Sequence, residues 1–348
     1  MITRGTTPPG LDPTLIFELF RGSYGSELLT AAVAHFNLFG VLSKRRLALS
    51  EFQSEFDLAE RPAVVLTTAL RAMGLLSVDA DDRFHLTAIA EQHLAPEAYF
   101  SVADYVGLAA TSPGVLEMVE RLRTNRPAGS DEDQGAAYIY REGIASAMEQ
   151  EELARHFTLA LAGRAKNVAP VLAERVSLDD SRTLLDVGGG TGIYSIALLQ
   201  KNPKLTAIVL DRPEVLKIAG EFAEEYGVSD RLELLEGDMF TSDLPKADTV
   251  LLSNVLHDWD APECRQLVSR CANSLSANGR LLIHDVLLHD ELDGPLAIAL
   301  YSAALFQLTE GRAYSRAEFQ SWLNESGLSY EGKVETLIHC AVLIGRKR

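Results

Sequence analysis

The chain has 348 residues, of which 47% are hydrophobic and 23% are charged, which is a globular composition with length for two domains. Its formal net charge of −17 argues against DNA or an anionic membrane as a partner. Three cysteines without a C-x-x-C spacing, and an N-terminus without an apolar signal-peptide core, indicate reduced thiols and a cytoplasmic protein.

Residues from about 15 to 94 are predicted to be mostly helical. A first amphipathic helix ends near Gly40, a second begins with Ser50 as its N-cap, and a third runs from Pro62 to Gly74. The stretch 75–86 then predicts a small hairpin, and three helices followed by a hairpin are typical of a winged helix.

A winged helix raises the possibility of a DNA-binding, ligand-responsive regulator. Residues 1–100 contain eight basic and twelve acidic side chains, so the basic face that DNA requires is missing. The basic triplet at 44–46 is interpreted as a solvated turn. We therefore expect this region to mediate dimerisation, with the regulator as the less favoured alternative.

The stretch 98–122 is predicted to be helical, 124–136 to be a loop, and 137–174 to be helical again. From position 183 onward, apolar strand segments alternate with helical segments, which predicts a mostly parallel α/β sheet with helices on both faces. The last two strands are too close for a crossover helix and must form an antiparallel hairpin. The uncharged stretch 294–309 is too short for a membrane span and is interpreted as a core helix. The expected strands are 183–187, 205–210, 231–235, 247–253, 279–287, 328–336 and 339–345, and the expected helices are 193–201, 213–226, 261–276, 294–308 and 316–326.

The stretch 183–192, TLLDVGGGTG, predicts a buried strand, a glycine turn and the start of a helix. The dinucleotide pattern would need Gly or Ala at position 193, where Ile193 stands. Asp186 at the strand end would repel a pyrophosphate but suits a ligand with an ammonium or sulfonium group. Asp211 ends the next apolar run, about where an acid would accept two ribose hydroxyls. Together the two acids predict S-adenosylmethionine, and a tight turn without a ligand is the alternative.

Polar residues also follow the later strands. Asp238 could accept the adenine amino group, and Met239 could pack on the adenine ring. His257, after the fourth strand, is the candidate catalytic residue, and Asp285 in the fifth strand could orient it and favour its protonated form. No spaced ligand motif indicates a metal.

These motifs carry a resemblance. The chain resembles the S-adenosylmethionine-dependent O-methyltransferases of the plant caffeate and bacterial polyketide-tailoring type over nearly its whole length. The resemblance depends on LDVGGGTG, Asp211 with Pro213, GDMF and LHDW, in the family's order and spacing. It implies a winged-helix-like dimerisation domain over 1–100, a helical connector over 101–165 that contributes to the acceptor pocket, and a Rossmann-like domain over 166–348. The implied sheet has seven strands, is mostly parallel and carries the antiparallel terminal hairpin.

The resemblance also assigns residues. It implies that His257 is the catalytic base and that the product is S-adenosylhomocysteine. Ser253 stands where the family often has a lysine that helps hold the cofactor. The resemblance implies that Gly188, Asp211, Asp238 and Met239 bind the cofactor. With the residues considered above, the candidate cofactor-binding residues are Asp186, Gly188, Gly190, Asp211, Asp238, Met239 and Ser253.

The acceptor end departs from the family pattern. Asp285 replaces a glutamate beside the base, and a second glutamate would fall at Ala313, so we expect at most one flanking acid. The expected reaction is methyl transfer to a hydroxyl of a small aromatic or polyketide-like metabolite by a homodimer. C- or N-methylation of an aromatic or 2-oxo acid, and non-methylating chemistry with the same cofactor, stay open. Candidate acceptor contacts, each equally compatible with a core role, are Tyr140, Met148, Phe157, Tyr301 and Phe306.

Overall fold

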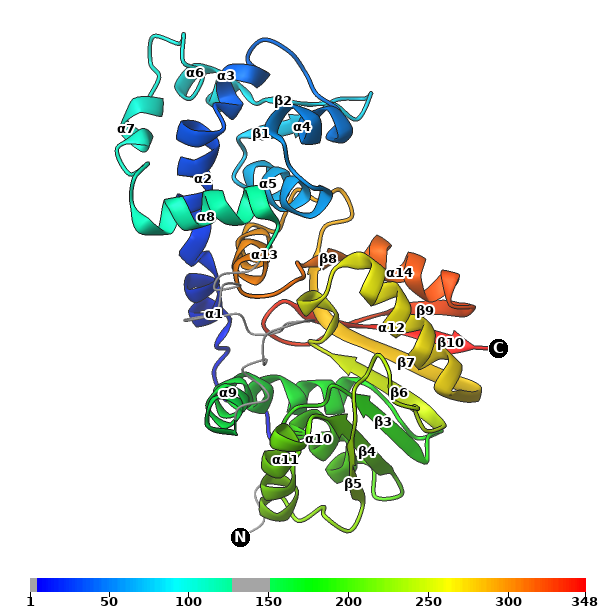
Figure 1. The fold of residues 1–348 in the computed structure, drawn as a ribbon. Coiled ribbons are helices and arrows are strands. Elements are labelled where there is room, and N and C mark those ends of the chain that lie inside the picture. The colour runs from blue at the N-terminus through cyan, green and yellow to red at the C-terminus, as the bar shows by residue number, and fades with distance from the viewer. Residues whose placement is uncertain (1–4, 127–150) are drawn as a thin grey trace. The chain divides into compact units, whose positions relative to one another are not determined.

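The computed structural model describes residues 5–126 and 151–348 (Figure 1). This part of the chain divides into two compact units. The sheet unit contains residues 5–17, 151–287 and 314–348, and the helical unit contains residues 18–126 and 288–313. The expected borders at 100 and 165 differ from this division, because α9 belongs to the sheet unit and α13 to the helical unit.

The helical unit has its own hydrophobic core, to which α13 contributes Ala303 and Phe306 beside Leu28, Leu66 and Met118. The helix α1 (Thr14–Arg21) spans the boundary between the two units along the chain. The further elements of the helical unit are η1 (Gly22–Tyr24), α2 (Gly25–Thr30), η2 (Ala31–His35), α3 (Leu38–Leu42), α4 (Leu49–Phe56), α5 (Glu60–Ala72), β1 (Leu76–Val78), β2 (Phe84–Leu86), α6 (Ala88–His93), α7 (Ala103–Gly107), α8 (Pro113–Thr124) and α13 (Leu296–Leu308).

The expected helix, helix, helix, hairpin order is present in α3, α4, α5 and the antiparallel pair β1 and β2. The predicted N-cap at Ser50 is wrong. The N-cap of α4 is Ala48, two residues before Ser50, and the Ala48 backbone N–H donates to the Glu51 carboxylate at 2.9 Å. Glu51, three residues into the helix, therefore satisfies the backbone N–H of the N-cap residue itself, whereas a serine N-cap would accept from an N–H within the first turn.

Arginines near the hairpin are paired with acids. Arg46 forms an ion pair with Asp79 at 2.8 Å, and Arg45 pairs with Glu55. Because neighbouring carboxylates neutralise these side chains, this part of the unit does not present the unpaired basic face that phosphate binding requires.

The sheet unit contains a central sheet that has, in the described chain, the strand order β5-β4-β3-β6-β7-β10-β9, with the short β8 beside β7. Strands β5, β4, β3, β6 and β7 are parallel, and β10 is antiparallel to both of its neighbours, which confirms the expected fold class. The strands are β3 (Thr183–Val187), β4 (Thr206–Asp211), β5 (Leu232–Glu236), β6 (Ala247–Ser253), β7 (Leu275–Leu288), β8 (Tyr314–Ser315), β9 (Leu328–Glu335) and β10 (Cys340–Lys347). The helices are α9 (Glu151–Arg175), α10 (Ile193–Lys201), α11 (Pro213–Glu225), η4 (Leu256–Asp258), α12 (Ala261–Ser274) and α14 (Arg316–Glu325).

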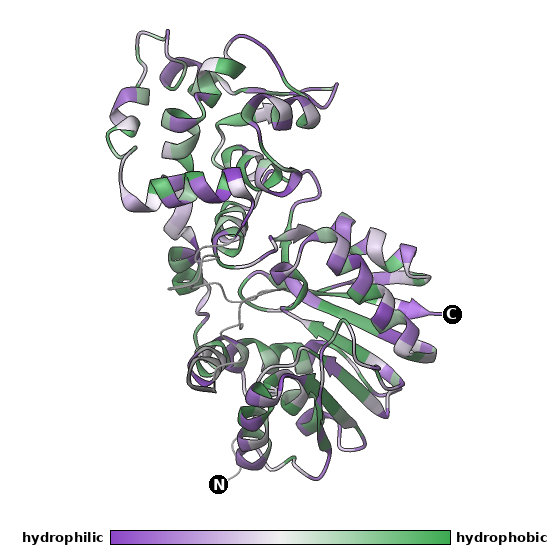
Figure 2. Cartoon of the chain, in the orientation of Figure 1, coloured by the Kyte–Doolittle hydropathy of each residue, from purple (hydrophilic) through white to green (hydrophobic). Residues whose placement is uncertain are grey.

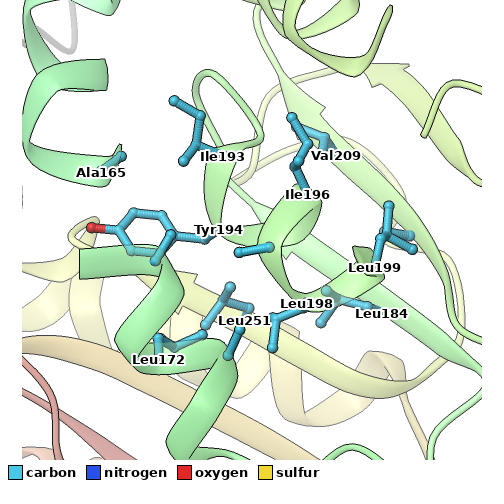
Figure 3. Packing of buried hydrophobic residues seen from close by; sticks show 14 of the residues in the cluster. Ala165, Leu172, Leu184, Ile193, Tyr194, Ile196, Leu198, Leu199, Val209 and Leu251 are labelled. Carbon is cyan, nitrogen blue, oxygen red and sulfur yellow. The ribbon is translucent and has the colours of Figure 1, made fainter. Parts of the chain in front are cut away.

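Helices cover both faces of the sheet, with α9, α10 and α11 on one face and α12 and α14 on the other (Figure 1). Successive strand residues point to opposite faces, so Leu184 and Leu282 pack toward α10, whereas Leu185 and Ile283 pack toward α12. Figure 2 shows the strands as mainly hydrophobic and the helices as mixed, and Figure 3 shows the packing on the α10 face. The same alternation places adjacent polar residues at the strand ends on different faces.

None of the helices in residues 5–126 and 151–348 combines the length and the apolar character that crossing a membrane would need. The stretch expected as a core helix is α13, whose Ala299 and Phe306 are fully buried.

Candidate cofactor and catalytic site

The glycine turn follows β3, and its glycines are needed for different physical reasons. Gly190 has φ +59°, and a Cβ at this position would meet no atom within 4 Å. A Cβ at Gly189 would lie 2.7 Å from the Cγ of Asp186 and 2.9 Å from a methyl group of Val209. Side chains of the protein thus fill the space beside Gly189, whereas the space beside Gly190 is empty. A ligand could approach the backbone closely at Gly190, where no side chain intervenes.

Asp186 lies beneath this turn. Its side chain is fully buried, and its Oδ2 accepts a hydrogen bond from the Ser195 hydroxyl of α10 at 2.7 Å. Burial raises the pKa of Asp186 to about 7, against the lowering effect of the serine bond. Its Oδ1 accepts no hydrogen bond from the residues that the structure describes. Contact between Asp186 and a cofactor stays a prediction, because the carboxyl group supports the turn from below.

Asp211 joins the end of β4 to the glycine turn. Its Oδ2 accepts the Gly190 N–H at 2.8 Å, and its Oδ1 accepts the Arg212 N–H at 2.7 Å. Burial raises the pKa of Asp211, and these two bonds oppose that effect. The carboxylate is therefore fixed at the open edge of the turn, where an acid was expected for ribose hydroxyls.

Asp238 and Met239 follow β5, the next strand along. The Oδ1 of Asp238 accepts the Phe240 N–H at 2.7 Å, and its Oδ2 accepts the Arg212 guanidinium at 3.0 Å. The sulfur of Met239 lies 3.7 Å from the position that a Cβ of Gly188 would occupy. The structure thus brings the expected residues after β3, β4 and β5 together along one edge of the sheet. A fixed carboxylate, a thioether and open glycine backbone fit an adenosine there.

His257 lies in η4, directly after β6, and Asp285 lies on β7. The two side chains are buried, and His257 Nδ1 is 2.6 Å from Asp285 Oδ1. Burial alone would lower the pKa of His257, but the charges of Asp285 and Asp258 raise it on balance. The paired charge of His257 conversely outweighs burial and holds the pKa of Asp285 low. The expected pairing of histidine and acid is therefore present.

A second acid flanks the histidine, so the expectation of at most one is wrong. Asp258 Oδ1 lies 3.7 Å from His257 Nε2, and burial raises the pKa of Asp258 to about 6. In the sequence Asp258 stands within the LHDW motif, and its position next to His257 is the signal that points to it. Ala313 has no side-chain carboxylate, and it lies fully buried in the helical unit, where its N–H donates to Ser302 Oγ at 3.1 Å.

A polar cluster lies on the α10 face at the ends of β6 and β7. Ser253 Oγ is 2.8 Å from His284 Nδ1, and His284 Nε2 is 3.0 Å from Thr336 Oγ1. Burial, with a contribution from the positive charge of Arg164, lowers the pKa of His284 to about 3, so this histidine is neutral. Ser253 is bonded within this cluster, and its contact with a cofactor stays a prediction.

We had not predicted two members of this cluster, Asn254 and Arg164. Asn254 donates to the Tyr194 hydroxyl at 3.2 Å and accepts a hydrogen bond from the Arg164 guanidinium. Arg164 could have been found from helical spacing, because it stands four positions before Val168 and eight before Leu172, both fully buried.

The acceptor candidates are not brought together in the described structure. Tyr140 and Met148 lie outside the described residues, and the side chain of Phe157 on α9 is not described either. Phe306 is fully buried in the helical core, with the Arg61 guanidinium 5.1 Å from its ring centre. Tyr301 is partly exposed beneath the Arg21 guanidinium, at 4.3 Å. Phe306 is placed as a core residue, and a role of Tyr301 at the acceptor stays a prediction.

A mostly parallel sheet with a glycine turn after β3 and acids at the ends of β4 and β5 identifies the class of S-adenosylmethionine-dependent methyltransferases. Comparisons agree with this class. Residues 128–329 match the family described as O-methyltransferase domain. A 3-hydroxy-5-methyl-1-naphthoate 3-O-methyltransferase from Streptomyces sahachiroi is 35% identical over 93% of this chain and 92% of its own length.

Two further relatives widen the comparison. An L-tyrosine C(3)-methyltransferase from Streptomyces lavendulae is 30% identical over 94% of this chain and 92% of its own. The crystal structure of an O-methyltransferase family 2 protein from Planctomyces limnophilus, in complex with apigenin, has 46% identity and a TM-score of 0.90, and covers 100% of this chain and 99% of that one. The chain belongs to the O-methyltransferase domain family, and it is an S-adenosylmethionine-dependent O-methyltransferase.

Proposed function

We propose that this chain methylates a hydroxyl group of a small aromatic acceptor, with His257 as the general base. The observation that carries the proposal is the 2.6 Å contact between His257 Nδ1 and Asp285 Oδ1. A carboxylate at Nδ1 fixes the tautomer in which Nε2 accepts a proton, and it stabilises the imidazolium that results.

S-adenosylmethionine supplies an electrophilic methyl group on a sulfonium. A phenol has an ordinary pKa of about 10, so little phenolate exists at neutral pH. As the acceptor oxygen forms its new bond to carbon and the carbon–sulfur bond breaks, the phenolic proton passes to Nε2 of His257. General-base help of this kind accelerates a reaction by roughly 10²- to 10⁴-fold.

Three groups of residues would hold the cofactor. Asp211 would accept ribose hydroxyls, Asp238 would accept the adenine amino group, and Met239 would pack on the adenine ring. The turn at Gly188 and Gly190 would pass beneath the ligand. Support comes from the fixed Asp211 carboxylate and from the open space above Gly190.

The relatives support a proposal for the acceptor class. The relative from Streptomyces sahachiroi is named for a hydroxynaphthoate, and the Planctomyces limnophilus protein was crystallised with apigenin. Both compounds are hydroxylated aromatics. We therefore propose a hydroxylated ring system of one to three rings as the acceptor.

C-methylation is the second candidate. Ala313 lacks a carboxylate, and one relative at 30% identity is named as a tyrosine C(3)-methyltransferase. In methylation at a ring carbon, that carbon attacks the methyl group, and an ionised phenolate on the same ring makes it nucleophilic enough to do so. Product analysis separates the two, because an O-methyl product loses its free hydroxyl whereas a C-methyl product keeps it.

The test is a labelled-methyl assay over a panel of flavones, hydroxynaphthoates and arylamines, with wild type and His257→Ala. We expect turnover of a phenolic substrate to fall by about 10²- to 10⁴-fold in the variant, with S-adenosylhomocysteine affinity little changed. His289→Ala is the matched control, since His289 is an exposed histidine paired with Asp293. Unchanged turnover in His257→Ala would refute the base assignment.

We further propose a homodimer that uses the N-terminal helix. Helix α1 exposes Leu15 (66%), Ile16 (69%), Leu19 (73%) and Phe20 (77%) at helical spacing, and Leu11 before it is 87% exposed. An apolar helix face of this kind is typical of a protein interface. A second copy fits because each copy would bury the same segment on the other, as twofold interfaces do.

Light scattering on the double variant Leu19→Glu/Phe20→Glu tests the dimer. The proposal expects a monomer for this variant and a dimer for wild type. Leu234→Glu is the control, because Leu234 is a 38% exposed apolar residue on β5. Dimers that survive in the double variant would contradict the proposed interface.

A further inference from the structure

The strand order determines where the two ends of the cofactor would lie. Asp211 ends β4 and Asp238 follows β5, on one side of the glycine turn, whereas β6 lies on the other side of β3. An adenosine held by the two acids therefore directs the methionine tail across the turn toward the end of β6. This step rests on the proposed placement of the adenosine.

Arg164 of α9 brings a guanidinium to that end of β6. Its Nη2 donates to Asn254 Oδ1 and to the sulfur of Cys340 at 3.2 Å. Asn254 directly follows β6 in the left-handed backbone conformation, with φ +58°. These two acceptors are neutral groups, and the guanidinium brings to this edge a positive charge that also acts on Asp258 and Asp285.

A chain of hydrogen bonds holds Asn254 in place. Its side-chain amide donates to the Tyr194 hydroxyl at 3.2 Å and to Ser253 Oγ at 3.1 Å. Ser253 in turn is bonded to the buried His284. Figure 3 shows the Tyr194 ring extending away from Ile196 and Leu198, with its oxygen at the far end. Ser253, His284 and Tyr194 lie on β6, β7 and α10, so these hydrogen bonds tie Asn254, and with it the guanidinium, to regular elements of the sheet unit.

Charge determines which group of the cofactor's methionine tail Arg164 can bind. The methionine tail carries a sulfonium, an α-ammonium and an α-carboxylate, and only the carboxylate is negative. A guanidinium near two cationic groups would be unfavourable unless it contacts the anion that accompanies them. Arginine also matches the flat geometry of a carboxylate with paired N–H donors.

We propose that Arg164 binds the α-carboxylate of the cofactor's methionine tail, and that Asn254 is its positioning residue. Arg164 thereby distinguishes S-adenosyl amino acids from adenosine thioethers that lack the amino-acid tail. The residue comes from α9, outside the strand-end motifs.

Calorimetric titration with two ligands tests this assignment. S-adenosylhomocysteine has the tail, whereas 5′-methylthioadenosine keeps the adenosine and the thioether but lacks the amino acid. In Arg164→Met we expect the affinity for S-adenosylhomocysteine to fall roughly 10- to 100-fold, as for a lost charged hydrogen bond. The affinity for 5′-methylthioadenosine should stay within about twofold, and Arg164→Lys should recover part of the loss.

The other outcomes overturn the proposal. Equal losses for both ligands would mean a structural role for Arg164, and no loss for either would exclude contact with the cofactor. A change confined to the KM of the acceptor would assign Arg164 to the acceptor instead. Arg164→Lys keeps a cation and provides the measurement if Arg164→Met does not fold. Asp211→Asn should weaken both ligands alike, and if it weakens neither, the adenosine placement fails separately.

Discussion

His257 Nδ1 and Asp285 Oδ1 lie 2.6 Å apart, although the two residues are 28 positions apart in the sequence. The parallel pairing of β6 with β7 produces this contact, because it brings the carboxyl ends of both strands to one edge of the sheet. Asp285 Oδ1 also accepts the N–H of Val286 at 2.8 Å, which fixes the carboxylate. The histidine is therefore oriented by a group that is itself held by backbone.

Asp285→Asn should move the pH dependence of the reaction. A general base works when deprotonated, so kcat/KM rises with pH through the pKa of free His257. Asp285 helps to raise that pKa. Without its charge the pKa falls, so the rise in kcat/KM should occur at lower pH while the plateau drops about tenfold or more, because the base is weaker and less well oriented.

Asp258→Asn is the matched control for that pH profile. Asp258 approaches the other ring nitrogen of His257 only to 3.7 Å, beyond hydrogen-bonding distance. Its removal should shift the profile in the same direction but leave the plateau near that of wild type. A profile that does not move in Asp285→Asn would contradict the coupling between the two side chains.

The glycine turn offers a comparison between two alanine variants. In Gly189→Ala the new Cβ would lie 2.7 Å from Asp186 Cγ, so the turn must shift, and the free energy of unfolding should fall by about 1–3 kcal/mol. In Gly190→Ala the new Cβ meets open space, and the cost is that of a left-handed conformation, about 1 kcal/mol.

The effects of these two variants on ligand affinity should not follow their effects on stability. Gly190→Ala places a methyl group in the space where the ligand would approach, so its affinity for S-adenosylhomocysteine should fall by more than its modest stability loss suggests. Urea unfolding and calorimetry on both variants check this. Wild-type affinity in Gly190→Ala would remove the argument for close approach at that position.

His284 predicts how stability responds to acid. Its pKa in the folded protein is about 3, against an ordinary value of 6.5. Below pH 6.5 the unfolded chain therefore binds a proton that the folded chain does not, so the free energy of unfolding falls as pH drops from 6.5 toward 3. At pH 5 the loss amounts to about 2 kcal/mol.

His284→Gln should reduce this acid sensitivity, because glutamine offers hydrogen bonds to Ser253 and Thr336 without a titrating group. Urea unfolding at pH 7.5 and pH 5 measures the difference between the two proteins. Equal losses of stability in wild type and variant would show that His284 does not cause the acid response.

The Arg212–Asp238 ion pair should matter little for stability. The two side chains are 44% and 31% exposed, and exposed pairs contribute less than about 1 kcal/mol. Arg212→Ala should therefore unfold near the wild-type midpoint and should bind S-adenosylhomocysteine as well or better, since Asp238 Oδ2 is released. Asp238→Ala should weaken that binding, and the same titration reveals whether it does.

The strands and helices of the sheet unit could be predicted closely, because apolar runs and helical spacing record burial directly. The expected strand 247–253 is β6, and the expected helix 193–201 is α10. β7 begins at Leu275 rather than at 279, because Leu275 already pairs with Ala247 of β6 before an irregular polar stretch, after which the pairing resumes at Arg280. Pattern alone does not report such backbone pairing.

The candidate site was predictable where strand ends carry it. His257 and Asp285 were both identified, because each stands at a strand end. Arg164 was missed because α9 approaches the site from far along the chain, and a helix can bring a single side chain to a strand end without any local motif. The division of the chain into two units could not be predicted, since nothing in the composition of residues 288–313 indicates which hydrophobic core they join.

The contribution of α13 to the helical unit bears on how this protein folds during synthesis. The core formed by Leu28, Leu66 and Met118 also needs Ala303 and Phe306, which lie near the other end of the chain. The ribosome synthesises the N-terminal helices long before it reaches α13. Apolar side chains of these helices therefore stay exposed while most of the sheet unit is translated. Shielding by chaperones during that interval would therefore affect the yield of folded enzyme, and a truncated N-terminal fragment would be prone to aggregate.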